Sequence, residues 1–178
     1  ISFMFGSTIN ALLPAFNTDV LSGGPDDLGL LMTGMGVGAI LGSLTAAKTS
    51  SLRHKGYWLL SIGASWGLAL TGLAFTWNFF QAIFAISVIG FMSTFAMSMN
   101  RSVVQLQVAR YMRGRIMSFD MMAHGLMPLG LIPIGYIAQT ISIEAGIATS
   151  GSLLFICMVI LGIMMPKIRA IDTGSRLS

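Results

Sequence analysis

Residues 79–99 read FFQAIFAISVIGFMSTFAMSM, a stretch without a charged side chain. This length matches the ~20 residues with which an α-helix crosses the hydrocarbon core of a bilayer. Similar apolar stretches occupy residues 3–20, 28–47, 57–76, 116–140 and 145–165. The chain is 54% hydrophobic and 9% charged, whereas a soluble domain has about 25% charged residues. The sequence therefore predicts an all-α polytopic membrane protein with six transmembrane helices.

The ends of the chain bear on its completeness. The chain begins at Ile1, the first apolar stretch starts almost at once, and no signal-peptide pattern precedes it. We therefore expect residues 1–178 to be one transmembrane unit of a protein truncated at its N-terminus. Cys157 is the single cysteine, so an internal disulfide is excluded.

Basic residues are confined to alternate connections between the apolar stretches. The connections after the first, third and fifth stretches contain no Lys or Arg; they hold Asp26, Asp27 and Glu144, with Asp19 just before them. Because cytoplasmic connections carry an excess of Lys and Arg, the other connections and the C-terminus are expected in the cytoplasm. The net charge of +4 then requires no nucleic-acid partner. The basic residues are Lys48, Arg53, Lys55, Arg101, Arg110, Arg113, Arg115, Lys167, Arg169 and Arg176.

Small residues recur every fourth position in the second stretch, at Gly34, Gly38 and Gly42. This spacing places them on one helix face, where small residues allow two membrane helices to approach closely. No strand precedes these glycines and no Lys-Ser/Thr pair follows them, so they do not form a nucleotide-binding loop. We expect a helix-packing face.

Polar residues form one stripe on the first predicted helix and another on the fourth. Polar groups on a spanning helix avoid lipid, because burial without a partner is costly. They either hydrogen-bond to neighbouring helices or line a water-filled cavity. Pro14 favours the cavity, since interrupted transporter helices border binding sites. The candidate cavity residues are Asn10, Pro14, Asn17, Ser87, Phe91, Thr94 and Ser98.

Residues 100–118 read NRSVVQLQVARYMRGRIMS and lead into a fifth stretch rich in Pro and Gly. This pattern, with ALLPAF at 11–16, resembles the C-terminal half of a major facilitator superfamily transporter. Within that superfamily it is similar to the enterobactin-exporter-like (transmembrane secretion effector) group of bacterial drug and siderophore exporters. The matching residues are Asn100, Gln105, Arg113, Gly114, Arg115, Ile116, Met117, Ser118, Pro128, Leu129 and Gly130.

The resemblance implies a half-bundle equivalent to helices seven to twelve of a multi-pass protein in the bacterial inner membrane. Its first and fourth helices would line a central cavity, and a missing N-terminal six-helix half would complete the path. A drug, siderophore or amphipathic metabolite would be exported by alternating access, with proton antiport and without a cofactor or metal. The sequence departs from the group because no Pro precedes Arg113, and because Asp120 stands where the group usually has an uncharged residue.

Asp120 and His124 begin the fifth stretch just beyond the basic connection. Asp120 lies five residues after Arg115, or ~7.5 Å of helix, which places it near the cytoplasmic face. One interpretation is a charge clamp with Arg101, Arg113 or Arg115 that closes a cytoplasmic gate. His124 lies one turn deeper, so the pair could alternatively relay a proton. In a third interpretation His124 is hydrogen-bonded without a coupling role.

Two other function classes compete with transport. Residues 63–67 read GASWG, a Gly-x-Ser-x-Gly pattern, and a pair of Ser65 with His124 would suggest an intramembrane serine protease. The strand–turn–helix context of a nucleophile elbow is missing, however, and glycines four apart suit helix packing. A dyad would place Ser65 Oγ within ~3.2 Å of a His124 nitrogen. The other class is a structural membrane protein that transports nothing.

Overall fold

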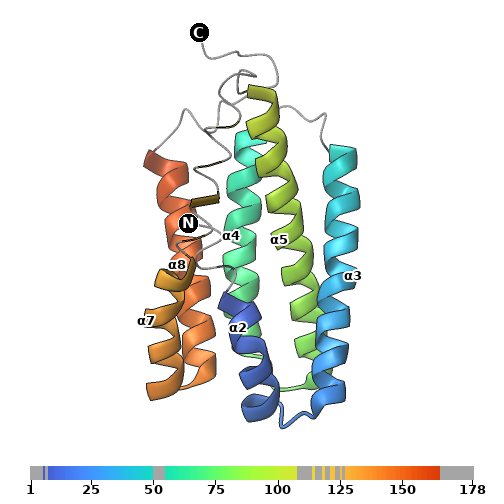
Figure 1. The fold of residues 1–178 in the computed structure, drawn as a ribbon, viewed down its shortest axis with the longest axis vertical. Helices are drawn as coiled ribbons and strands as arrows, with labels where there is room; N and C mark the ends of the chain where they lie inside the picture. The colour runs from blue at the N-terminus through green and yellow to red at the C-terminus, as the bar shows by residue number, and fades with distance from the viewer. Residues whose placement is uncertain are drawn as a thin grey trace.

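The computed structural model describes residues 6, 8–49, 55–107, 114, 118, 121–122, 125 and 127–164. In this part of the chain every regular element is a helix, and the predicted all-α fold is confirmed. The long helices run antiparallel along a common axis (Figure 1). They are α2 (Thr8–Ala15) with the π-helix η1 (Phe16–Val20), α3 (Pro25–Thr49), α4 (Lys55–Leu73), α5 (Phe79–Gln107), α7 (Met127–Thr140) and α8 (Ile143–Met164).

Three of these helices are long and apolar enough to cross a membrane by length and composition: Pro25–Thr49, Phe79–Arg101 and Ile143–Met164. Tyr57–Leu73 and Leu129–Thr140 are shorter apolar helices. Many large apolar side chains lie on the outside of the bundle, among them Ile40, Phe80 and Ile163. A contiguous apolar exterior of this kind is what a bilayer covers.

Local signals fix where the helices begin. Pro25 occupies the first turn of α3, where its missing N–H costs nothing. The backbone N–H of Gly24 donates to Asp27 Oδ2 at 2.8 Å, which ties the entering chain to that turn. The N–H of Ala145 donates to Ser142 Oγ at 3.1 Å, so Ser142 caps α8. The sequence thus encodes the tight connections at this end of the bundle.

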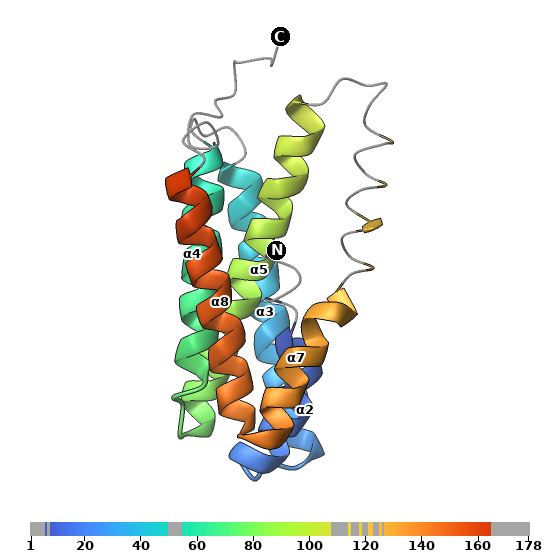
Figure 2. The same cartoon turned by 90° about the vertical axis from the view of Figure 1, so that its left-hand side faces the viewer.

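The helices pack mainly as two pairs, α3 with α5 and α4 with α8, and α4 also contacts α5. Figure 2 shows α4 and α8 along one side of the bundle and α2 with α7 along the other. The buried core between α4 and α5 includes Leu70, Leu73, Ile86 and Ile89. The α4–α5 contact therefore joins the two pairs.

Glycine determines how closely each pair approaches. A Cβ at Gly38 would collide with the backbone carbonyl of Ser87, and one at Gly42 would collide with that of Phe91. In the second pair, a Cβ at Gly67 would lie 2.7 Å from the backbone nitrogen of Phe155. Both contacts bring backbone against backbone, which any larger side chain would prevent.

We predict that Gly38→Ala lowers the stability of the bundle, because the added methyl group has no room beside the Ser87 carbonyl. Overpacking of this kind costs about 1–3 kcal/mol. Gly36→Ala is the matched control on the same helix, since a Cβ at Gly36 meets nothing within 4 Å. Thermal unfolding of the full-length protein in detergent should show a lower Tm for the first variant only. Equal Tm values would contradict this account of the α3–α5 contact.

Candidate functional site

Pro14 lies inside the continuous helical segment that α2 and η1 form together. Pro14 has no backbone N–H, so the carbonyl of Asn10 loses the donor that an α-helix would supply. Two residues later the helix widens into η1, where the N–H of Leu21 donates to Phe16 O at 3.2 Å. The hydroxyl oxygen of Thr18 lies 3.2 Å from the carbonyl oxygen of Pro14. Short π-helical segments of this kind are frequent at functional sites.

One face of α2 is buried and the other is open. Ile9, Leu13 and Phe16 are buried, and the helix packs on α7 and α8. Asn10 and Pro14 are exposed on the open face. Asn10 lies ten residues before Val20, or ~15 Å along a helix, which is about half the hydrocarbon thickness. An amide at that depth cannot face lipid without loss of hydrogen bonds, so this face requires a polar surface or water.

Asn17 has a different environment from Asn10. Its side chain is 1% exposed, and its Nδ2 donates to the carbonyl of Gly24 at 2.9 Å. Its own carbonyl accepts from the N–H of Gly23 at 2.8 Å. Ser22, between them, adopts a positive φ of 51°. Asn17 therefore holds the turn that joins η1 to α3, and its buried Oδ1 has no hydrogen-bond partner.

The stripe on α5 divides into two parts. Ser87 and Phe91 face α3, where their backbone carbonyls contact the glycine face, and Ser87 Oγ donates to the carbonyl of Ile83 at 2.8 Å. Helix packing accounts for this part. Thr94 and Ser98 are half-buried and Arg101 is exposed. The part of the stripe beyond Phe91 is the part that remains a candidate for a cavity wall.

The glycines Gly34, Gly38 and Gly42 lie along the same contact. Gly38 and Gly42 are buried, and a Cβ at Gly34 would lie 3.0 Å from Ser87 Oγ. The glycine face of α3 and the part of the α5 stripe at Ser87 and Phe91 are thus two sides of one interface. The sequence presents the glycine face and the polar stripe as separate features, because residue spacing identifies a helix face but not the helix that packs against it.

Among the described residues, the acidic side chains lie at one end of the bundle and Lys48 lies at the other. Asp19, Asp26 and Asp27 lie near the η1–α3 turn, and Glu144 lies in the first turn of α8 at the same end. Lys48 ends α3 at the opposite end. Thr18 donates to Asp19 Oδ1 at 2.9 Å, so this acid is held within its own turn. Within the described ranges no group of His, Cys, Asp and Glu could hold a metal ion.

Four of the predicted gating residues, Arg113, Arg115, Asp120 and His124, lie outside the described residues. The distance between Ser65 and His124 is therefore not defined by the structure. Ser65 Oγ donates to the carbonyl of Ser61 at 2.9 Å within its own helix. The two glycines that flank Ser65 face α8: a Cβ at Gly63 would lie 2.8 Å from Met158 Sδ, and Gly67 abuts the α8 backbone. Helix packing explains the GASWG pattern.

Comparison with known proteins agrees with this architecture. Residues 1–178 match the family described as transmembrane secretion effector, a family of the major facilitator superfamily. A staphyloferrin A transporter of Staphylococcus aureus is 32% identical over 117 residues, which cover 64% of this chain and 28% of that protein. No solved structure matches the chain. The chain spans well under half the length of this relative, and it belongs to the transmembrane secretion effector family of transporters.

Proposed function

We propose that this chain forms one half of a secondary transporter that exports a small molecule by alternating access, driven by proton antiport. The observation that carries the proposal is the open face of α2, where Asn10 and Pro14 are exposed just before the helix widens into η1. Broken helices at mid-membrane depth supply the binding sites of many transporters, because their freed backbone groups and polar side chains contact the substrate. In α2 the amide of Asn10 and its freed carbonyl would play this part.

A second six-helix half would cover this face. The relative is far longer than the chain, as the 28% coverage shows. A cavity between two halves would supply the water or polar surface that Asn10 requires. We place Asn10 and Pro14 on one wall of the cavity and Thr94 and Ser98 on another. Asn17, Ser87 and Phe91 would support these walls from behind.

A siderophore is the substrate class that we favour. The support is the relative named as a staphyloferrin A transporter, together with a candidate wall that offers hydrogen-bonding groups rather than an apolar surface. A drug or amphipathic metabolite is the alternative within the same mechanism. The full-length protein would then export this substrate across the bacterial inner membrane.

Asn10→Ala in the full-length transporter should reduce export of its substrate without reducing protein abundance. The amide is exposed on the open face of α2. Asn17→Ala is the matched control, because it removes the donor to Gly24 and should lower abundance or Tm. Export from intact cells and membrane abundance would be measured side by side. Parallel losses of export and abundance for Asn10→Ala would favour a packing role instead.

We further propose that the acidic end faces outward and that the C-terminus is cytoplasmic, since Lys48 and the basic connections mark the cytoplasmic side. In full-length protein whose native cysteines are replaced, Asn78→Cys should react with an impermeant maleimide on intact cells. Lys48→Cys should react only after permeabilisation. The reverse pattern would invert the topology.

The cytoplasmic gate in this proposal is a clamp of Asp120 with Arg101, Arg113 or Arg115. Asp120→Asn would remove the charge of this clamp, so it should weaken the closed cytoplasmic side and leave the fold intact. Cysteine probes on that side should become more accessible at unchanged expression. Unchanged accessibility, with loss of the pH dependence of export, would assign Asp120 and His124 to a proton relay.

A further inference from the structure

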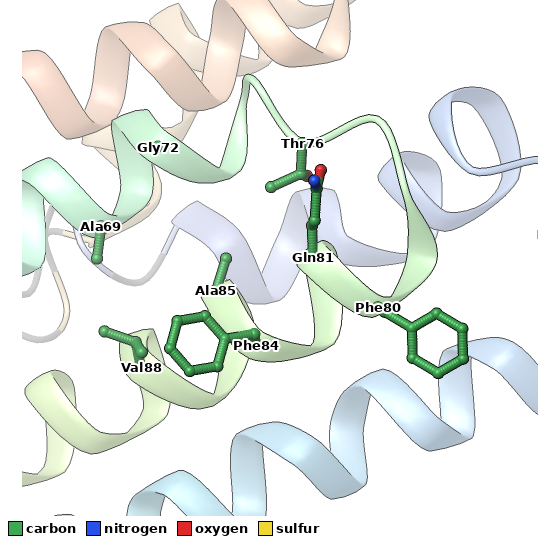
Figure 3. Close-up of a pocket in the computed structure, with 8 residues that line it drawn as sticks. All are labelled: Ala69, Gly72, Thr76, Phe80, Gln81, Phe84, Ala85 and Val88. Carbon is green, nitrogen blue, oxygen red and sulfur yellow. The ribbon is translucent and has the colours of Figure 1, made fainter.

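A groove of about 560 Å³ runs between α4 and α5 near the acidic end of the bundle (Figure 3). Small residues, Ala69 and Gly72, line its α4 side. A Cβ at Gly72 would meet nothing within 4 Å, so the hollow extends to the α4 backbone itself. The lining residues are Ala69, Gly72, Thr76, Phe80, Gln81, Phe84, Ala85 and Val88.

The groove occupies a face of α5 that its helix contacts do not use. Gln81, Phe84, Ala85 and Val88 follow one another at steps of three, one and three residues, which places them along one side of the helix. A second side, with Ile86, is buried in the core, and a third side packs on α3. Phe84 remains 72% exposed. No described helix covers this side of α5.

The groove also has a polarity gradient along its length. Its polar side chains, Thr76 and Gln81, lie at the end next to the α4–α5 turn (Figure 3). Trp77 in that turn is 87% exposed, as expected of an aromatic residue at the membrane–water interface. From Gln81 to Val88 the groove then runs over apolar side chains for ~10 Å of helix. This depth falls within one leaflet of a ~30 Å hydrocarbon core.

The two polar side chains at the mouth of the groove, Thr76 and Gln81, differ in whether they have a hydrogen-bond donor available for a ligand. The hydroxyl of Thr76 donates to the carbonyl of Leu73 at 2.7 Å, so its donor is used. Gln81 Oε1 accepts from the backbone N–H of Trp77 at 3.4 Å. The amide of a glutamine also carries two N–H donors on Nε2. Gln81 can thus offer a neutral hydrogen-bond donor at the level where lipid ester groups lie.

We infer that this groove is a phospholipid site, which holds one acyl chain of a bilayer lipid along Phe84, Ala85 and Val88 in the leaflet at the acidic end. Gln81 Nε2 donates to an ester carbonyl of the same lipid. None of the described residues that line the groove is charged, so the acyl chain and the ester, rather than an anionic headgroup, determine binding. The groove is open to the hydrocarbon along its side, and a chain enters laterally. The site is separate from the open face of α2.

The test uses the full-length transporter in vesicles of phosphatidylglycerol and phosphatidylethanolamine. Part of the phosphatidylglycerol carries a diazirine at the middle of one acyl chain. After photolysis, cross-linked peptides are identified by mass spectrometry. The site predicts labelling concentrated in residues 69–88, above that of equally exposed segments of α3 and α8.

Gly72→Leu places a side chain in the hollow, where a Cβ would meet nothing within 4 Å, and should reduce labelling of residues 69–88 to the level of the other helices. Ile156→Phe, which adds bulk on the exposed side of α8, is the control and should leave it unchanged. Gln81→Leu should weaken labelling by shortening the residence of the lipid. Tm values of the variants identify any loss of fold, and a misfolded variant is replaced by Ala85→Leu.

Three results would overturn the inference. Labelling in proportion to exposed area on every helix would indicate ordinary annular lipid. Unchanged labelling in both groove-filling variants would place the lipid elsewhere. Competition by the exported substrate would make the groove part of the transport path. The first two results do not depend on what the protein exports, so failure of the lipid site by either of them is distinguishable from failure of the proposed function.

Discussion

The close approach of α3 and α5 is the contact on which the rest of the bundle depends. It places the Ser87 carbonyl where a side chain on Gly38 would have to lie. In a bilayer the hydrophobic effect does not drive helices together, so such an interface relies on van der Waals contact between backbones. With α3 fixed on one side of α5, the core residues Ile86 and Ile89 turn toward the remaining helices. The glycine face therefore sets the orientation of α5, and with it the position of the apolar groove.

The fold could be predicted from the sequence because lipid imposes a simple rule. Every backbone polar group within the hydrocarbon must be satisfied internally, so uncharged stretches of sufficient length become helices. The apolar stretch at 79–99 corresponds to α5, and the stretch at 145–165 to α8. Which glycines meet which helix was not predictable, because spacing identifies a face but not its partner. The pairing of Gly67 with α8 was missed for this reason.

In the candidate site, too, residue spacing identified a helix face but not the surroundings of each residue on it. Asn10 and Asn17 occupy the same face of an ideal α-helix, and periodicity treats them alike. The chain reverses direction after Val20, and the turn at Gly23 and Gly24 folds back over Asn17. One asparagine thus became a structural residue, while the other stayed on the open face. The signal that could have separated them is the Ser-Gly-Gly turn that follows at 22–24, which marks where the helix must end.

The segregation of charge has a consequence for energetics. The charged side chains that the structure describes lie toward the two ends of the helices, with Asp19 and Asp26 at one end and Lys48 at the other. An elementary charge that crosses a membrane potential exchanges about 2.3 kcal/mol per 100 mV. If these helices rock as a rigid unit, the described charges stay outside the region where the potential falls. The membrane potential would then do little work on the motion of this part of the protein, and voltage sensitivity would have to arise from the substrate, the coupling ion or residues elsewhere.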